Sequence, residues 1–500
     1  MKNVKDQIND PFFDAINSQS LDVYQRRIVL DNSDSLLVVA GAGSGKTLTI
    51  IGKIKYLIEK QNIKEKEILC ISFTNETVNN LKKKIGYDID CFTFHKLSLE
   101  ILKDFNYKFK IVSDNLLEYI TDEFLEYISY YDLRYLVLEY FKDLIKEKDI
   151  TYERFKMKYC NLFIGYKKMI ISFIKKIKTN NHGYEDFLWY IKRSYKSSDH
   201  EKNKCFLIIV FNIYIWYEEE LSSSLQIDFD DMINLSSKLV EESGFKRHYK
   251  YIIIDEFQDT SWSRYVLIKN IMEKTKAKLM CVGDDYQSIY GFSGCTLDLF
   301  INFPKYFPKA KIMYIKNTYR NCYEVINTSC SFIKKNRYQL KKNLNAMFTL
   351  KNPINIIYYK NSDYKSKFIQ LLEYLYSINK KEVLVLGRYN NDINEVCDEL
   401  SFKDMNLKYL TVHKSKGLEC DDVIIINLTN RYLGFPSQIT DDKIFELINS
   451  NNENYPYAEE RRLFYVALTR TKRNIYLLVP EINYSCFIDE ISTRCNIIKL

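Results

Sequence analysis

The sequence Ser35-Leu-Leu-Val-Val-Ala-Gly-Ala-Gly-Ser-Gly-Lys-Thr47 decides the fold class of this chain. Its apolar first half is typical of a buried strand, and the following LTIIGKIKYLIEK has a helical pattern. The glycines between them allow backbone N–H groups to surround phosphate oxygens at a helix N-terminus. Lys46 would neutralise the phosphates and the Thr47 hydroxyl can ligate Mg²⁺. The stretch predicts an α/β domain with a nucleotide-binding loop.

The predicted loop contains Ala40, Gly41, Ala42, Gly43, Ser44, Gly45, Lys46 and Thr47. Ala40 stands where the GxxxxGK[ST] pattern has its first glycine, which narrows the allowed backbone but keeps the phosphate-facing N–H groups. A plain glycine turn beside an incidental lysine is the alternative interpretation. Glycine usage favours the phosphate site, because the chain has only 14 glycines. Seven of them lie at 41, 43, 45, 283, 291, 294 and 417, in three candidate site segments.

Two further strand ends carry polar residues suited to ATP hydrolysis. The strand Tyr251–Ile254 ends in Asp255 and Glu256, which we expect to hold Mg²⁺ and to accept a proton from the attacking water. The next strand leads to Gln287, which is placed to contact the γ-phosphate. An acidic strand end alone has a structural role at least as often as a catalytic one. Together with the loop, it indicates hydrolysis of ATP.

Two aromatic residues, Tyr290 and Phe292, follow the glutamine closely. Aromatic rings at such a position can stack on nucleic-acid bases, each stack contributing about 1–3 kcal/mol. Two core aromatics are the alternative. Such stacking would couple the state of the bound nucleotide to the binding of a nucleic-acid strand.

Short apolar runs typical of buried parallel strands recur along the chain and alternate with helical patterns. They lie at 35–40, 68–73, 251–254, 279–282, 311–315, 383–387, 422–428 and 474–479. Between them, tyrosine- and lysine-rich sequence has apolar residues at helical spacing. We therefore expect an α/β protein with a first domain over 1–103 and 205–301, a helical insertion over 104–204, and a second domain over 302–500.

Composition excludes several other classes of protein. The longest apolar stretch, Cys205 to Tyr217, is shorter than the ~20 residues that cross a bilayer, and the first residues show no secretion signal. The twelve cysteines form no CxxC pair, so we expect reduced thiols in a cytoplasmic protein. A formal net charge of +8 is compatible with a polyanionic partner.

Nine segments together resemble the UvrD/Rep group of superfamily 1A DNA helicases, in the order of that family. They are LDVYQRR (21–27), AGAGSGKT (40–47), ISFTNET (71–77), TFHKLSL (93–99), IIIDEFQD (252–259), VGDDYQSIYGFSG (282–294), NTYRN (317–321), TVHKSKGLE (411–419) and EERRLFYVALTRTK (459–472). The resemblance implies two RecA-like domains, ATP and Mg²⁺ as cofactors, and movement 3′ to 5′ along single-stranded DNA or from a tail into duplex DNA.

Matching positions imply individual roles. Gln25 would recognise adenine, Tyr319 would stack on it, and Glu419 would contact the ribose. Arg320 and Arg470 would approach the γ-phosphate from the second domain. Lys416 and Gly417 match the turn that links nucleotide to strand. The positions resembling those that hold single-stranded DNA are Phe73, Thr93, His95, Tyr290, Phe292 and His413.

The chain also departs from the family. Leu48 stands where UvrD has arginine, and Phe292 replaces a common tryptophan. Only about ninety residues separate Arg320 from Thr411, so we expect the large inserted 2B domain to be absent or vestigial. No appended nuclease domain is expected.

The sequence leaves other functions open beside an autonomous helicase. The chain could be an ATP-switched DNA-binding subunit of a repair or anti-phage complex whose partner supplies nuclease activity. RNA stays open as a track, because stacking tolerates both sugars. A P-loop kinase or GTPase is disfavoured, because its chemistry needs neither NTYR nor TVHKSKGLE.

Overall fold

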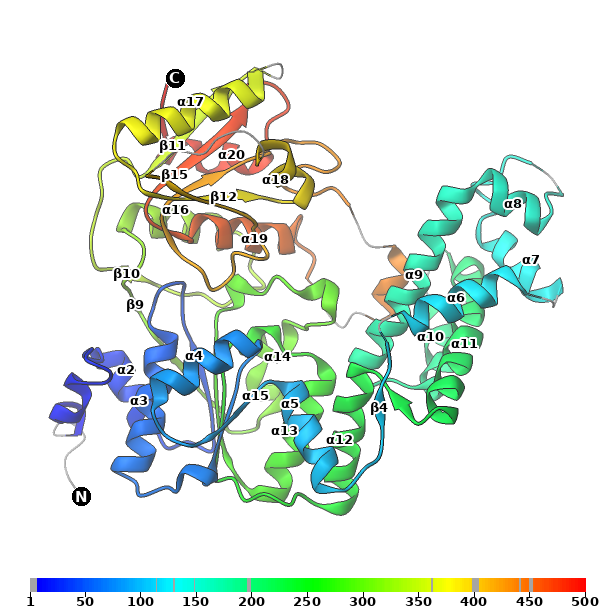
Figure 1. Ribbon diagram of the computed structural model, residues 1–500, viewed down its shortest axis with the longest axis horizontal. Coiled ribbons are helices and arrows are strands. Elements are labelled where there is room, and N and C mark those ends of the chain that lie inside the picture. Colours follow the sequence, from blue (N-terminus) through cyan, green and yellow to red (C-terminus); the bar gives the residue numbers. More distant parts are fainter. Residues whose placement is uncertain are drawn as a thin grey trace.

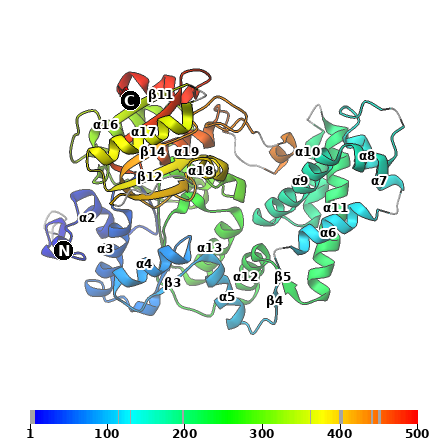
Figure 2. The ribbon, with the colours of Figure 1, turned by 45° about the horizontal axis from the view of Figure 1, so that its top comes forward.

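The computed structural model describes residues 7–113, 115–128, 131–147, 149–195, 199–360, 363–397, 404–439, 442–448 and 453–500. It contains two six-stranded parallel sheets, each covered by helices, and a helical arm beside them. The two sheet units lie one above the other, with the arm on one side (Figures 1 and 2). The predicted α/β class with a helical region is confirmed.

The first sheet has the strand order β3-β2-β6-β7-β1-β8. Its strands are β1 (Ser35–Val39), β2 (Ile68–Ile71), β3 (Asp90–Phe92), β6 (Tyr251–Ile254), β7 (Lys278–Gly283) and β8 (Lys311–Tyr314). In β1, Leu36 and Val38 pack on one face, whereas Leu37 and Val39 pack on the other. This alternation places apolar side chains on both faces, so helices must cover both.

Helices cover the two faces of this sheet unequally. One face packs against α2 (Val23–Leu30), α3 (Lys46–Glu59) and α4 (Asn75–Ile85). The other packs against α5 (Phe94–Asp104), α12 (Phe229–Ser243), α13 (Trp262–Thr275), α14 (Asp298–Ile301) and α15 (Phe303–Tyr306). Both layers leave the carboxyl ends of the strands free to carry the predicted site residues.

The first unit extends further along the chain than expected. Strand β8 pairs with β1, from Leu36 opposite Lys311 to Val39 opposite Tyr314. The apolar run at 311–315 is therefore a strand, but it belongs to the first sheet and follows residue 302, where we expected the second domain to begin. An apolar run indicates a strand but does not name the sheet that it joins, because pairing is a tertiary contact.

The helical arm lies between α5 and α12 in the chain. It contains α6 (Leu116–Glu126), α7 (Tyr131–Tyr140), α8 (Tyr152–Lys158), α9 (Cys160–Thr179), α10 (Phe187–Ser194) and α11 (His200–Ser223). A small parallel pair, β4 (Lys110–Ile111) and β5 (Gln226–Ile227), closes its base. The arm thus starts and ends later than the expected 104–204, because α11 continues its apolar pattern to Leu221.

The second sheet has the strand order β13-β12-β14-β15-β11-β16. Its strands are β11 (Ile354–Tyr359), β12 (Glu382–Gly387), β13 (Asn406–Thr411), β14 (Cys420–Ile425), β15 (Thr471–Pro480) and β16 (Asn496–Ile497). One face packs against α16 (Tyr323–Ile333), α19 (Ala458–Leu468) and α20 (Cys486–Ile491), and the other against α17 (Tyr364–Ser377) and α18 (Asn390–Val396). The short pair β9 (Asn317–Thr318) and β10 (Asn345–Ala346) lies between the two units.

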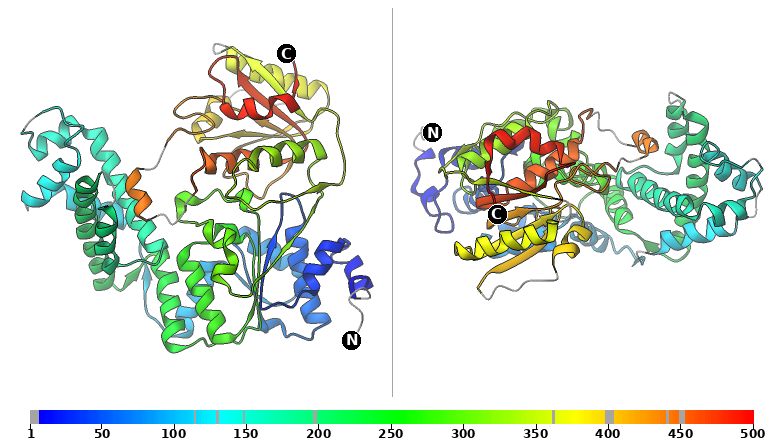
Figure 3. Two further views of the ribbon diagram at one scale, coloured as in Figure 1. Left: turned by 180° about the vertical axis from the view of Figure 1, so that it is seen from behind. Right: turned by 90° about the horizontal axis from the view of Figure 1, so that it is seen from above.

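A short segment of the second unit is packed into the helical arm. This is the 3-10 helix η8 (Lys443–Leu447), whose Ile444 is buried in the core of the arm. Arg193 donates to the Leu447 carbonyl at 2.8 Å, and Asn180 donates to the Ile448 carbonyl at 3.4 Å. Seen from behind and from above, η8 lies against the arm and away from its own sheet (Figure 3). The arm therefore contacts both sheet units.

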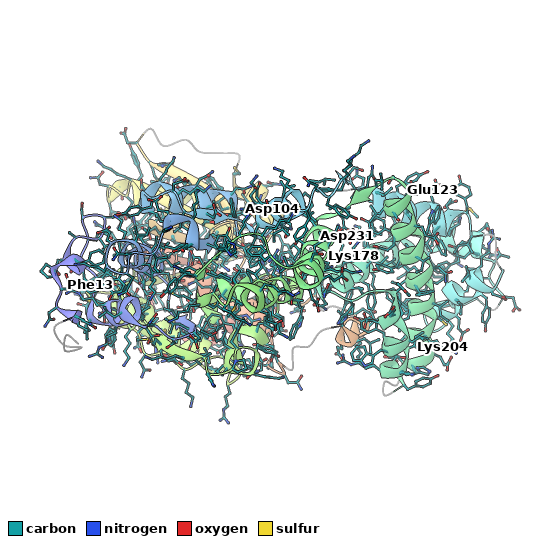
Figure 4. The ribbon with its side chains drawn as sticks, turned by 90° about the horizontal axis from the view of Figure 1, so that it is seen from below. Phe13, Asp104, Glu123, Lys178, Lys204 and Asp231 are labelled. Atoms are coloured by element: carbon teal, nitrogen blue, oxygen red, sulfur yellow. The ribbon has the colours of Figure 1, made fainter. Side chains whose placement is uncertain are left out.

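A buried ion cluster joins the arm to the first unit. Lys178 on α9 is 3% exposed, and its Nζ lies 2.7 Å from carboxylate oxygens of Glu218, Asp228 and Asp231. Figure 4 shows Lys178 and Asp231 side by side at this junction. One cation thus compensates carboxylates from α11 and from the start of α12.

All twelve cysteines are free thiols, most of them buried. Within the described residues, no helix has the length and apolar character required to cross a bilayer.

Replacing Lys178 with methionine should destabilise the protein by about 3 kcal/mol, because three carboxylates lose their cation. The expected loss in the free energy of unfolding is at the low end of the range for buried ion pairs, since the carboxylates are partly exposed. Urea unfolding followed by circular dichroism measures the change. Lys238→Met on α12 is the matched control: that lysine is exposed and its pair with Glu242 spans 3.9 Å, so the loss should stay below about 0.5 kcal/mol. Equal losses would contradict this account.

Candidate functional site

A cleft of about 1120 Å³ separates the carboxyl ends of the first sheet from the second unit. Most of the predicted nucleotide-site residues line it. They are Gly41 to Thr47, Asp255, Glu256, Gln287, Tyr319, Arg320, Glu419 and Arg470. Lys472 and Arg473 add further positive charge to the wall. The cleft therefore has cations on both sides, as a polyanionic ligand requires.

The glycine loop is closely covered by the second unit. Gly43 has a φ of +67°, and a Cβ at this position would lie 2.3 Å from the Cβ of Arg320. Tyr319 donates its backbone N–H to the Gly43 carbonyl at 3.0 Å. Both the backbone conformation and the contact require glycine here. The glycine loop is thus in direct contact with the NTYRN segment.

Two predicted loop neighbours lie outside the cleft lining. Ala40 is fully buried, and its N–H donates to the Gly283 carbonyl at 2.9 Å, which ties the end of β1 to β7. Gln25 is 1% exposed and donates to the carbonyls of Ser44 and Gly45 at 3.3 and 3.4 Å. Gln25 therefore lies directly behind the loop, at the start of α2.

Tyr319 is half-exposed and held by an acid of the first unit. Its hydroxyl donates to Asp22 Oδ2 at 2.9 Å, and burial together with this carboxylate raises its pKa to about 12. The other oxygen of Asp22 caps α2 by accepting from the N–H groups of Tyr24 and Gln25. One carboxylate thus orients both residues predicted to contact adenine.

The loop lysine and the two acids form one charged group. Lys46 Nζ lies 2.8 Å from Glu256 Oε1, and Gln258 donates to the other oxygen of Glu256 at 2.6 Å. Burial favours neutral Glu256, but Lys46 and Lys416 outweigh it and lower its pKa. Burial and the adjacent Glu256 charge raise the pKa of Asp255. The backbone of Glu256 is left-handed, with a φ of 53°, a costly conformation that is common at functional sites.

The residues predicted to hold Mg²⁺ suit a hard cation. Thr47 and Asp255 line the same cleft and supply a hydroxyl and a carboxylate oxygen. Asp255 is only 7% exposed, so its charge needs compensation. A divalent ion between this carboxylate and a phosphate chain would provide it.

Gln287 is held in one orientation by two neighbours. Its Nε2 donates to Asp284 Oδ2 at 2.6 Å, and its Oε1 accepts from Arg470 at 3.2 Å. Glutamine has one donor end and one acceptor end, so these two partners fix which end faces which side.

Arg470 is a buried cation with neutral hydrogen-bond partners. It is 1% exposed and donates to the carbonyls of Val466 and Leu418 as well as to Gln287. Burial and the nearby Arg320 lower its pKa to about 9. No carboxylate within the described part of the chain lies at ion-pair distance from it. Arg320 differs, since its Nε donates to Glu419 at 2.7 Å.

The predicted DNA-contacting aromatics form a second cluster that spans both units. Phe73 and Tyr290 are stacked, with centroids 6.0 Å apart and ring planes 6° from parallel. Phe292 and His413 lie edge to face at 5.6 Å, and Tyr290 contacts both. Phe292 is 63% exposed. The cluster therefore presents ring faces to solvent at the junction of the two units.

Thr93 and His95 lie apart from this ring cluster, at the start of α5. Thr93 caps the helix by accepting from the Lys96 N–H at 3.2 Å, and His95 packs edge to face against the exposed Phe229 at 5.3 Å. Sequence reasoning missed Arg264, whose guanidinium lies 4.6 Å from the Phe73 ring centroid. Nothing in its surroundings in the sequence indicates this contact.

Lys416 connects the two clusters. Its Nζ lies 2.5 Å from Asp259 Oδ2 and 2.8 Å from the Gln287 carbonyl, and 4.8 Å from the Tyr290 ring centroid. The lysine comes from the second unit, whereas its partners belong to the first. One side chain therefore contacts both the Gln287 segment at the cleft and the aromatic cluster.

Comparison with known proteins agrees with this geometry. Residues 21–308 match the family described as UvrD/REP helicase N-terminal domain. The chain belongs to the UvrD/REP helicase family. The match includes the glycine loop, both acids, Gln287 and the Tyr290 segment.

Individual relatives extend the similarity into the second unit. The chain is 26% identical over 510 residues to DNA helicase IV of Escherichia coli K12, covering 96% of this chain and 71% of that protein. It is 27% identical over 338 residues to ATP-dependent DNA helicase PcrA of Staphylococcus epidermidis, covering 64% of this chain and 41% of PcrA. PcrA of Staphylococcus aureus is 26% identical over the same length.

Two half-buried histidines, His95 and His413, should make the stability of the protein depend on pH. Burial, aided by Arg264 at His95 and by Arg388 and Lys416 at His413, lowers both pKa values from 6.5 to about 4. The unfolded chain binds these protons more readily, so their contribution is present above about pH 6.5 and is lost as the pH falls toward 4. A variant with His95→Gln and His413→Gln should lose less thermal stability between about pH 7 and pH 5 than the wild type. His248→Gln, at an exposed histidine, should retain the wild-type slope.

Proposed function

We propose that this protein is an ATP-dependent translocase that moves 3′ to 5′ along single-stranded DNA and separates duplex DNA. The observation that carries the proposal is Arg470, a buried guanidinium that faces the cleft with no carboxylate partner among the described residues. A buried unpaired cation is costly unless an anion completes it. The γ-phosphate of ATP, bound at the glycine loop, would supply that anion.

The side chains of the cleft have separate roles in the proposed hydrolysis. Triphosphate charge would compete with Glu256 for Lys46, which frees Glu256 to accept a proton from the attacking water. Thr47 and Asp255 would hold Mg²⁺, which neutralises phosphate charge when bound. Gln287, Arg320 and Arg470 would contact the γ-phosphate, with both arginines supplied by the second unit. Hydrolysis then requires the two units to be closed.

The adenosine part would bind at the edge of the loop. Tyr319 offers a half-exposed ring that Asp22 orients, and Gln25 lies behind the loop. Glu419 pairs with Arg320 and Lys472 and would turn toward the ribose as Arg320 moves to phosphate. These contacts support ATP as the nucleotide.

The aromatic cluster supports a track of single-stranded DNA. Phe73, Tyr290, Phe292 and His413 offer ring faces on both units, so relative movement of the units changes the space between them. Lys416 ties that cluster to Gln287. Thr93 and His95 would contact the strand further along the first unit. Coupled closure and stacking is the basis of the proposed movement.

We also propose a domain assignment. The first sheet unit is RecA-like domain 1A, the helical arm is domain 1B, and the second sheet unit is RecA-like domain 2A. Between Tyr323 and Thr411 the described elements are those of the second sheet, its helices and β10, which supports the absence of a large 2B insertion. The proposed boundaries follow the observed elements, with β8 in domain 1A.

ATP hydrolysis by the purified chain should increase strongly when single-stranded DNA is added. Glu256→Gln should lower kcat about 10²–10⁴-fold, because it removes the proton acceptor, while ATP and DNA binding persist. A coupled ATPase assay with and without an oligonucleotide measures both effects. Glu273→Gln, at an exposed position of α13, is the control. A folded wild-type protein whose hydrolysis ignores DNA would refute the motor.

Arg470→Ala should lower kcat about 10³–10⁵-fold and leave ATP binding within a few-fold, because the arginine acts mainly on transition-state charge. Single-turnover hydrolysis and binding of a fluorescent ATP analogue separate the two effects. Arg494→Ala, at an arginine that contacts the Asn327 carbonyl on the surface, should leave both unchanged. A loss of binding as large as the loss of hydrolysis would assign Arg470 to anchoring only.

A second candidate is an ATP-switched DNA-binding subunit of a repair or anti-phage complex. The short connection between Arg320 and Thr411 favours it, since an additional domain could be supplied by a partner. Strand displacement on duplexes with a 3′ or a 5′ tail separates the candidates. Unwinding from the 3′ tail by the isolated chain supports the motor, whereas DNA-stimulated hydrolysis without displacement supports the subunit.

A further inference from the structure

Lys342 is a buried lysine that the function described so far does not use. It lies on the segment that returns from α16 to the first unit before β11 begins. The side chain is 2% exposed, contacts Asp284 Oδ1, and lies 2.6 Å from Asp285 Oδ1. Its ammonium also lies 3.7 Å from the Tyr286 ring centroid and 3.5 Å from the Ala40 carbonyl.

The ammonium compensates two carboxylates that are completely buried. Asp284 and Asp285 are both 0% exposed and adjacent in the chain. Burial raises the pKa of Asp285, and Lys342 opposes that rise. Burial would lower the pKa of Lys342, but the two carboxylates outweigh it and raise the pKa. Removing the ammonium would leave two like charges side by side in a dry environment.

Asp284 connects Lys342 to Gln287 at the cleft. One oxygen of Asp284 contacts Lys342, and the other accepts from Gln287 Nε2 at 2.6 Å. This acceptor fixes the donor end of the amide, so Oε1 faces Arg470 at 3.2 Å. If the carboxylate of Asp284 were displaced, the amide would lose the partner that defines its orientation.

Docking of the returning segment has its own contacts. The Leu340 N–H donates to Asp285 Oδ2 at 2.9 Å, and the Tyr286 hydroxyl donates to the Leu340 carbonyl at 2.8 Å. Gln339 donates to the Asp285 carbonyl at 3.2 Å. These three hydrogen bonds attach the segment to the first unit and do not involve the Lys342 ammonium. The ammonium can therefore have a role other than docking the segment.

We propose that Lys342 is a positioning residue for ATP hydrolysis: it holds the carboxylate of Asp284 in place, and Asp284 in turn holds Gln287 toward Arg470 and the γ-phosphate. The proposal rests on the proposed function of Gln287. It adds a residue from the connection between the two units to the machinery of the cleft. Lys342 touches no phosphate and acts only through Asp284 and Gln287.

A double-mutant cycle on the full chain tests this inference. Lys342→Met should lower the DNA-stimulated kcat roughly 30–100-fold and change KM for ATP less than about 3-fold, since misplacing a group in the cleft costs about 10²-fold. Gln287→Ala should lower kcat at least as much. In the double variant the loss should equal that of Gln287→Ala alone, because both changes remove one function. Lys341→Met, at the exposed neighbouring lysine, should match the wild type.

The outcomes separate this inference from the proposed function. Multiplied losses in the double variant, or lower thermal stability with unchanged kcat, would overturn the role of Lys342. Wild-type hydrolysis that DNA does not stimulate would instead overturn the motor. If Lys342→Met fails to fold, Asp284→Asn replaces it, because that variant keeps the Lys342 pair with Asp285. It should show the same kcat loss and the same lack of additivity with Gln287→Ala.

Discussion

Balance of buried charge at the cleft between the two sheets is the constraint on which the rest of this structure depends. The carboxyl ends of parallel strands bring Lys46, Asp255 and Glu256 together on one side. The second unit brings Arg320 and Arg470 to the other side. The acids and Lys46 compensate one another, whereas among the described residues Arg470 hydrogen-bonds only to neutral groups. An anion bound between the units would compensate the charges of Arg320 and Arg470. Binding of the anion would therefore favour closure of the two units.

The same constraint accounts for the position of the aromatic cluster. Gln287 and Tyr290 are separated by two residues on one segment, so a shift of that segment moves both residues. Lys416 contacts the carbonyl of the first and the ring of the second, from the opposite unit. In the proposed mechanism, closure of the two units around phosphate would therefore displace the ring faces that would hold bases. Because η8 belongs to the second unit and packs into the arm, movement of the second unit would also involve the arm.

The sequence predicted those parts of the protein that depend on neighbours in the chain. The strand, glycine loop and helix around Lys46 are local, and all eight predicted apolar runs are strands. Edge strands such as β13 were missed because their side chains are mixed in polarity and half-exposed. The unit to which β8 belongs, and the end of the arm at Ser223, depend on tertiary packing. Neither can be read from an apolar pattern alone.

Site residues divide in the same way. Gln287 was predicted from its place after a strand, and Arg470 from a match to a family pattern. The structure brings the two side chains into contact across the cleft. Lys342 was not found, since it lies in a lysine-rich stretch and its acid partners Asp284 and Asp285 are 58 and 57 residues away in the chain. A lysine in such a stretch is ordinarily solvated, and only the fold makes this one the cation for two buried acids. The orientation of Gln287 thus depends on a residue whose sequence context resembles a surface. Its importance follows from burial and charge together, which no local pattern contains.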